Sequence, residues 1–380
     1  MKNRDRLVQT FLDLVRIDSP SGKEEACALW VKNHLEGLGY RPTLHKGNLL
    51  LKIKGDKEGP KILFSTHLDT VQPGEGVKPK IVDPDGNLVQ SPYSDDAIIR
   101  SSGDTILGAD DKAGIAAILE VLATLKEENF PIPDLRFAFT VGEEIGLLGA
   151  KSLDKEVLDS DWGYVLDSSG PVGAIIHQAP AQDNIRIEVR GRAAHAGIAP
   201  EAGLNAIMVA GQILTKLPLG RIDAETTSNI GKITGGVATN IVPERVVLEG
   251  EARSRSLEKL DALVAQMQDI ALDVAEAFGA TAEIEVDRRY PSFSLPESAS
   301  VIRAFLKAAE GIGLSPTVQG SGGGSDGNIF NSLGLPTAVL GMSWQDIHTT
   351  EERISVGNLV RIAKLVRAVI ETCAEEETKW

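Results

Sequence analysis

Histidine, aspartate and glutamate, the residue types that ligate hard and borderline divalent metals, stand at five separated places in the chain. His67 and Asp69 occur in ILFSTHLDTV, where a spacing of two points both side chains to the same side of an extended chain. Asp110 and Asp111 occur in LGADDKAG, directly before a helical pattern whose N-terminal dipole favours carboxylates. The remaining places are Glu143 and Glu144 in TVGEEIG, Asp167 in YVLDSSG and His348 in QDIHTTEE.

Each of these places has an ordinary structural explanation when it is considered alone. A histidine at a strand end is often a structural residue, an aspartate before a helix is usually a cap, and paired glutamates after a strand often form a solvated loop edge. Taken together, carboxylates gathered at strand ends need compensating charge, which a divalent cation supplies. Imidazole and carboxylate without thiolate indicate zinc, cobalt or manganese in a catalytic site rather than a structural zinc site.

The same residues are sufficient for hydrolysis at a two-metal centre. Two ions about 3.5 to 4 Å apart require a carboxylate that bridges them. Amide hydrolysis further requires a water held by the metals and a free carboxylate that removes its proton. The five places hold enough residues for all of these roles.

Five segments resemble, in the same order along the chain, the metal motifs of the zinc exopeptidase family that includes aminoacylase, bacterial carboxypeptidase G and peptidase T. The resemblance extends over nearly the whole chain, because the segment inserted between the fourth and fifth motifs lies where that family carries its lid and dimerisation domain. The segments are STHLDTV, GADDKAG, TVGEEIGLLGA, VLDSSG and IHTTEERI.

The resemblance implies a role for each residue of the motifs. Asp110 would bridge two zinc ions, for which Co²⁺ or Mn²⁺ could substitute, and the peptide bond between Asp110 and Asp111 would be cis. Asp69 would orient His67, and Glu143 would be the general base. The other ligands would be His67 and Asp167 on one metal, and Glu144 and His348 on the other.

The resemblance also implies a reaction, in which Glu143 activates a metal-bridging water that attacks the peptide bond. VLDSSG, AAHAG and GGVATNIVPE are most similar to peptidase T, so a tripeptide aminopeptidase acting on short peptides is expected. A carboxypeptidase or N-acyl amino acid amidohydrolase with the same di-zinc centre remains the alternative. A protein that only binds a ligand would have lost a metal ligand or the base, and this sequence retains every position.

Substrate contacts are expected from two further parts of the chain. In similar proteins a histidine matching His195 reaches the active site of the partner subunit of a homodimer and stabilises the oxyanion, and an arginine matching Arg253 holds a substrate carboxylate. Arg255 would face the same side of a strand as Arg253, so the choice between them stays open. GSGGGSDG lacks the lysine of a phosphate loop and is expected to line the substrate cleft. The contact residues expected are His195, Asn240, Arg253, Ser325 and Asp326.

Hydrophobic periodicity predicts the elements that must position these residues. Apolar strands alternating with helices predict a three-layer α/β/α zinc-exopeptidase catalytic domain, formed by residues 1–177 and 290–380. Residues 178–289 read as βαββαβ, which predicts an inserted ferredoxin-like lid and dimerisation domain. In the first part, strands are predicted at 48–54, 61–66, 135–141 and 162–167.

Composition limits the function classes. The 380 residues carry a formal charge of −15, which disfavours nucleic acid and anionic membranes as partners and suits an enzyme that binds divalent cations. No apolar run of signal-peptide or membrane-spanning length is evident. Two cysteines, Cys27 and Cys373, cannot build a disulfide framework, so we expect both to be packing residues in a reducing cytoplasm.

Overall fold

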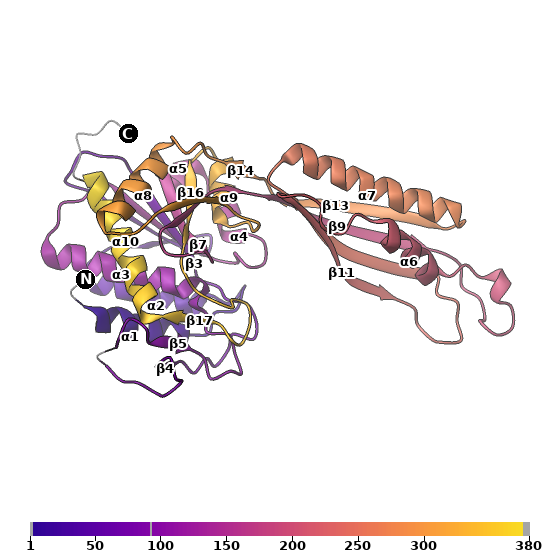
Figure 1. Cartoon of the computed structure of the whole chain (residues 1–380), viewed down its shortest axis with the longest axis horizontal. Helices are drawn as coiled ribbons and strands as arrows, with labels where there is room; N and C mark the ends of the chain where they lie inside the picture. Colours follow the sequence, from indigo (N-terminus) through magenta and orange to yellow (C-terminus); the bar gives the residue numbers. More distant parts are fainter. Residues whose placement is uncertain (1–2, 92, 375–380) are drawn as a thin grey trace. The chain divides into compact units, whose positions relative to one another are not determined.

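A computed structural model describes residues 3–91 and 93–374, and the chain divides into two compact units (Figure 1). The main unit comprises Met1–His177, Leu295–Gly320 and Ser325–Trp380. The inserted unit comprises Gln178–Ser294 and Ser321–Gly324. The main unit is therefore built from separate stretches of the chain, and it holds all five motif segments.

The second boundary differs from the expected one, because residues 290–294 and 321–324 lie with the inserted unit. The hydroxyl of Tyr290 donates to Gln182 Oε1 at 2.7 Å. Gly324 packs against the Tyr290 ring so closely that a Cβ would lie 2.3 Å from a ring carbon, which only glycine permits. These contacts of Tyr290 keep residues 290–294 with the inserted unit, and hydrophobic periodicity in the sequence does not reveal them.

Eight strands of a nine-stranded mixed sheet form the centre of the main unit, while the ninth, β14, belongs to the inserted unit. Strands β6, β3, β7 and β16 are neighbours and run parallel, so their carboxyl ends meet at one edge of the sheet. The flanking strands β2 and β8 run antiparallel to this group, and β15 (Thr317–Gly320) pairs with β8. The path of the sheet is β1 (Thr43–His45), β2 (Asn48–Ile53), β6 (Leu135–Thr140), β3 (Ile62–His67), β7 (Trp162–Ser168), β16 (Thr337–Gly341), β8 (Ala174–Ala179) and β14 (Phe293–Ser294).

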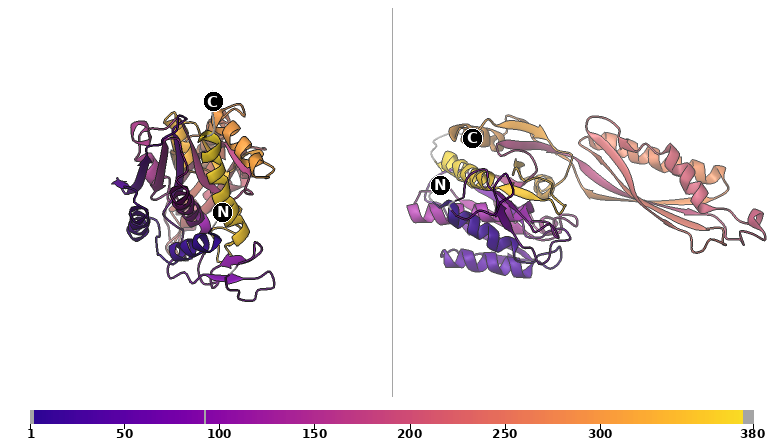
Figure 2. Two further views of the ribbon diagram at one scale, coloured as in Figure 1. Left: turned by 90° about the vertical axis from the view of Figure 1, so that its left-hand side faces the viewer. Right: turned by 60° about the horizontal axis from the view of Figure 1, so that its bottom comes forward.

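Helices flank this sheet on both sides, which gives the predicted α/β architecture (Figure 2). The longest, α3 (Ala109–Glu128), packs on β3 and β7 through a stripe that includes Ile115, Ile118 and Leu122, all fully buried. No helix of the described residues is long and apolar enough to cross a membrane. The others are α1 (Arg4–Val15), α2 (Glu25–Gly37), α4 (Leu148–Lys151), α5 (Lys155–Leu158), α8 (Ser300–Gly311), α9 (Asp326–Ser332) and α10 (Val356–Ala374).

A small three-stranded sheet ties the segment before α10 to the rest of the main unit. Strand β5 (Ile98–Arg100) lies between β4 (Lys80–Val82) and β17 (Arg353–Ser355). Both pairings are antiparallel. The loop that carries His348 enters this sheet at Arg353, so its C-terminal end is anchored.

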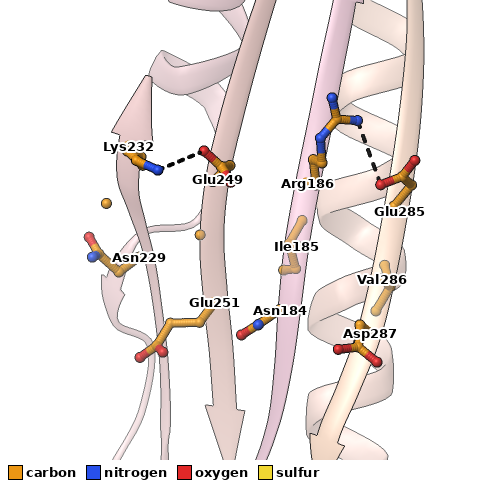
Figure 3. Close-up of a pocket in the computed structure, with 12 residues that line it drawn as sticks. Asn184, Ile185, Arg186, Asn229, Lys232, Glu249, Glu251, Glu285, Val286 and Asp287 are labelled. Carbon is orange, nitrogen blue, oxygen red and sulfur yellow. Dashed lines mark ion pairs between the residues drawn. The ribbon is translucent and has the colours of Figure 1, made fainter. Parts of the chain in front are cut away.

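The inserted unit has the predicted βαββαβ elements with a two-residue strand, β10, added before β11, and its two helices lie on one face of the antiparallel sheet. Alternate residues of β9, such as Ile185 and Ile187, are buried beneath the helices. Figure 3 shows part of the opposite face, where polar side chains form cross-strand ion pairs such as Lys232–Glu249. The elements are β9 (Ala181–Arg190), η1 (Pro200–Ala202), α6 (Ala206–Lys216), β10 (Gly220–Arg221), β11 (Thr226–Gly235), β12 (Arg245–Ser254), α7 (Leu257–Ala277) and β13 (Thr281–Tyr290).

Replacing Ile187 with alanine is expected to destabilise the inserted unit by about 2–5 kcal/mol, because it leaves a cavity in a packed core. Thermal unfolding measures the loss, and metal affinity should not change, because the motif residues all lie in the main unit. Glu285→Ala is the matched control, because Glu285 is exposed in an ion pair with Arg186 at 3.6 Å and should contribute less than about 1 kcal/mol. Equal losses from the two substitutions would contradict the assigned core.

Candidate metal centre

The parallel strands bring the motif residues to one edge of the main sheet. His67 is the last residue of β3, and Asp167 lies near the end of the neighbouring β7. Glu143 and Glu144 follow the end of β6, which is the other neighbour of β3. Because the carboxyl ends of parallel neighbours coincide, three separated segments meet in space.

The candidate ligand atoms form three groups, of which two share Asp110 and the third comprises His67, Glu143 and Glu144. His67, Asp110 and Asp167 each offer an atom within 4.8 Å of the others, and Asp110, Glu144 and His348 do the same. The Nε2 of His67 lies 3.1 Å from Asp110 Oδ1, and the Nε2 of His348 lies 3.3 Å from Asp110 Oδ2. The two carboxylate oxygens of Asp110 therefore face different histidines, as a bridging ligand requires.

Asp69 orients both His67 and the turn after β6. The Nδ1 of His67 lies 2.9 Å from the Asp69 carbonyl oxygen and 3.5 Å from its carboxylate, so the shorter contact is with the main chain. A proton on Nδ1 leaves Nε2 free as a ligand. The carboxylate of Asp69 accepts hydrogen bonds from the backbone N–H groups of Glu143 and Glu144 at 3.0 and 3.2 Å, and from the Ser21 hydroxyl at 2.7 Å.

The peptide bond between Asp110 and Asp111 is cis, as expected. The buried carboxylate of Asp111 accepts hydrogen bonds from the Thr66 hydroxyl and from the backbone N–H of His67. Gly114 makes this arrangement possible, because a Cβ there would lie 2.7 Å from Asp111 Oδ1. Asp111 therefore connects the start of α3 to the end of β3.

The imidazoles and Asp110 stabilise one another's charged forms. The pKa of His348 is raised to about 10, because its ring hydrogen-bonds to Asp110 and Glu144. Burial opposes the charge on Asp110, but hydrogen bonds with His348 and His67 outweigh it and lower the pKa of Asp110 to about 2. These two histidines are thus the cations that the protein itself supplies at the site.

The carboxylates of Glu143 and Asp167 have too little positive charge nearby. Burial and the charges of Asp326, Glu144 and Asp110 raise the pKa of Glu143 well above its usual range. Burial and the charges of Glu143 and Asp110 do the same to the pKa of Asp167. Divalent cations would supply the missing positive charge and favour the ionised forms of both carboxylates. With nitrogen and oxygen donors only, the residues fit zinc, cobalt or manganese.

Known proteins share both the sequence and the fold of this chain. The family model described as peptidase family M20/M25/M40 matches residues 63–372. The chain belongs to this family. A tripeptidase from Staphylococcus aureus is 40% identical, with 98% of this chain and 99% of that chain covered and a TM-score of 0.92. The aminopeptidase PepT from Bacillus cereus is 41% identical at 98% and 99% coverage, with a TM-score of 0.87. Peptidase T from Escherichia fergusonii is 27% identical over 98% of this chain and all of its own.

These matches confirm the predicted α/β fold and the resemblance to peptidase T. Membership of the M20/M25/M40 family makes the protein a metallopeptidase that hydrolyses peptide bonds. The two ligand groups around Asp110 are consistent with a metal centre.

In the inserted unit of this M20 family member, the structure places His195 beside Asn240. The backbone N–H of Ala196 donates to the Asn240 carbonyl oxygen at 2.9 Å, and both side chains are exposed. The Nδ1 of His195 accepts hydrogen bonds from the backbone N–H groups of Gly197 and Ile198, each at 3.2 Å. In the neutral ring this puts the proton on Nε2, which leaves an N–H donor directed away from the turn.

Arg253 lies near the other end of the same sheet. It pairs in register with Gln182, at the start of β9, whereas His195 follows the end of β9. At about 3.3 Å per residue, β9 covers about 26 Å from Gln182 to Arg190, so Arg253 lies far from the end of β9 that leads to His195. Arg253 binds Glu251 through Nε and Nη2, at 2.8 and 3.1 Å. Strand β12 ends at Ser254, so the alternation argument does not extend to Arg255.

The structure places Ser325 and Asp326 elsewhere than the expected cleft-lining loop. Ser325 is buried and caps α9, with its hydroxyl accepting a hydrogen bond from the backbone N–H of Gly327. Asp326 is also buried, and its Oδ2 accepts a hydrogen bond from the Thr140 hydroxyl at 2.5 Å. These positions suit the support of α9 and of the Glu143 surroundings better than substrate contact.

Proposed function

We propose that this protein is a di-zinc tripeptide aminopeptidase, in which Co²⁺ or Mn²⁺ can replace zinc. The observation that carries the proposal is the position of Asp110 in both ligand groups, with Glu143 in a further group with His67 and Glu144. The identity of about two fifths to a tripeptidase and to an aminopeptidase PepT supports the substrate class. Asp110 would bridge the ions, and the other ligands would be His67 and Asp167 on one side and Glu144 and His348 on the other.

In this proposal Glu143 moves the proton. Two bound divalent ions would polarise the scissile carbonyl and lower the pKa of a water molecule. Glu143 removes the proton from the attacking water and later delivers it to the leaving amine. Asp69 holds the backbone of Glu143 and Glu144 through its carboxylate, so that the base and the neighbouring ligand keep a fixed separation.

The proposal also includes a homodimer in which His195 acts on the substrate of the partner subunit. Its Nε2–H would donate a hydrogen bond to the oxyanion that forms when the carbonyl is attacked. Asn240, on the adjoining segment, would assist it. Arg253, at the distant end of the sheet, would hold a substrate carboxylate. We also propose a cytoplasmic location, supported by the two cysteines, which are free rather than disulfide-bonded.

The substrate assignment is tested with a panel of di- and tripeptides that are free, blocked at the N-terminus or blocked at the C-terminus. Chromatography of the products identifies which residue is released. We expect a free tripeptide to yield its N-terminal amino acid and a dipeptide, and N-acetylation to abolish cleavage. Cleavage of only N-blocked substrates would instead assign the protein as an N-acyl amino acid amidohydrolase. Release of the C-terminal residue would assign it as a carboxypeptidase.

A further inference from the structure

We infer that Glu352, which none of the roles above includes, is a positioning residue that holds Asp110 in place for metal binding. The inference rests on the proposed metal centre and adds a residue to it. Glu352 follows His348 by four positions and is 1% exposed. It belongs to the segment that carries His348, and its carboxylate contacts the segment that carries Asp110.

The Glu352 carboxylate accepts three hydrogen bonds from the backbone that leads into α3. Its Oε2 accepts from the N–H groups of Leu107 and Gly108, at 2.8 and 2.7 Å. Its Oε1 accepts from the N–H of Asp110 itself, at 3.1 Å. The carboxylate thus fixes the main chain of the residue that both ligand groups share.

The backbone at this point needs such a partner. Leu107 and Gly108 precede α3, and Asp110 has non-helical dihedrals, so their N–H groups need acceptors outside the helical ladder. Gly108, with φ of 78°, turns the chain immediately before α3. No side chain of the segment caps α3 locally. Glu352 supplies the acceptors from a segment more than two hundred residues away along the chain. The direction in which the Asp110 side chain leaves the backbone therefore depends on Glu352.

The position of Glu352 is itself fixed by the loop that carries His348. Gln345 and Arg353 pair through both of their backbone hydrogen bonds, at 2.9 and 3.1 Å, and so close the loop around His348. Arg353 then begins β17, which pairs with β5. Glu352 therefore connects an anchored loop to the backbone at the start of α3. The same two segments also meet where His348 Nε2 lies 3.3 Å from Asp110 Oδ2.

Glu352→Gln distinguishes the hydrogen bonds to Leu107 and Gly108 from the hydrogen bond to Asp110, because it keeps the size of the side chain. One oxygen can still accept from Leu107 and Gly108, but the new amide nitrogen would face the N–H of Asp110, where two donors repel. Asp134→Asn is the matched control. Asp134 is also a largely buried carboxylate that accepts a backbone hydrogen bond, from Gly55 at 2.9 Å, and it lies outside the ligand segments.

The experiment titrates metal-free full-length protein with Co²⁺ and follows its visible absorption, together with kcat and KM for a free tripeptide. We expect Glu352→Gln to weaken Co²⁺ binding by about 10- to 100-fold, the effect usual for groups that support metal ligands, and to change the Co²⁺ spectrum. At saturating Co²⁺, kcat should fall while KM changes little, because the perturbed residue supports the reacting centre. Asp134→Asn should leave the affinity, the spectrum and kcat unchanged.

Unchanged Co²⁺ affinity and spectrum in Glu352→Gln, with only a lower unfolding temperature, would overturn the inference and leave Glu352 a cap of α3. If Glu352→Gln does not fold, Glu352→Asp decides, because it keeps the charge but is one methylene too short to reach all three N–H groups. Weakened Co²⁺ binding in Glu352→Asp would support the inference, and the affinity of the unaltered protein would overturn it. Failure of the unaltered protein to bind Co²⁺ would refute the proposed metal centre itself, which is a different result.

Discussion

Replacing Glu143 with alanine is expected to leave both metals bound and to lower kcat by about 10²- to 10⁴-fold, the usual contribution of a general base. Glu143 offers a carboxylate near His67, but it belongs to neither of the two groups that contain Asp110. Its removal therefore takes away the proton acceptor while His67 and Asp110 remain. Metal content by elemental analysis and turnover of a free tripeptide are measured on the same preparation.

Glu144→Ala is the matched comparison, because the two residues are adjacent and both backbone N–H groups are held by Asp69. Glu144 lies in the group with Asp110 and His348, so its loss is expected to reduce the bound metal as well as the rate. Added Zn²⁺ or Co²⁺ should then restore part of the activity of Glu144→Ala and none of that of Glu143→Ala. If both variants lost metal equally, this division of roles between the two glutamates would be wrong.

Asp110→Ala is expected to have the larger effect on metal binding, because Asp110 belongs to both ligand groups. The variant should retain neither metal tightly and should have no measurable peptidase activity. His348→Ala removes a residue of one group only, and is expected to retain one metal per chain. Elemental analysis after dialysis against metal-free buffer measures both variants.

Circular dichroism and thermal unfolding serve as the control, since Asp110 also hydrogen-bonds to His67 at 3.1 Å and its loss could disturb the fold. A folded Asp110→Ala protein that keeps as much metal as His348→Ala would show that Asp110 does not bridge. Two metals retained in His348→Ala would remove His348 from the ligand set.

The elements of both units could be predicted from the sequence because their hydrophobic periodicity is strong. The predicted strand at 61–66 is β3, Ile62–His67, and the predicted helix following Asp111 is part of α3. The parallel pairing of β3 with β6 then explains why His67 and Glu143 come together, because residues that follow such strands share one edge. The family resemblance supplied the roles, which spacing alone left open.

Side-chain hydrogen bonds between distant segments could not be predicted in this way. Ser21 and Glu24, for example, have the spacing that predicts a capping box, but α2 begins at Glu25 without a side-chain cap. Ser21 instead donates to Asp69, and the Glu24 carboxylate accepts from the backbone N–H groups of Gly22 and Gly142. Glu352 was missed for the same reason, because a glutamate four residues after a histidine carries no sign of a partner at Asp110.

Burial of polar residues was the other limit. Asp326 follows a run of glycines and was expected in a loop facing substrate, whereas it begins α9 and is buried against Thr140. Burial raises the pKa of Asp326 to about 6. The negative charge of the Asp326 carboxylate in turn helps to raise the pKa of Glu143. Composition favours an exposed loop at such a segment, and only packing against β6 reveals otherwise.

The most direct test of the central claim is a titration of metal-free protein with Zn²⁺ while the hydrolysis of a free tripeptide is followed. The protein should be inactive at the start, bind two ions per chain and release the N-terminal amino acid at a rate that rises with occupancy. Fewer than about one tightly bound or activating ion per chain, or full peptidase activity in the metal-free protein, would contradict the di-zinc aminopeptidase.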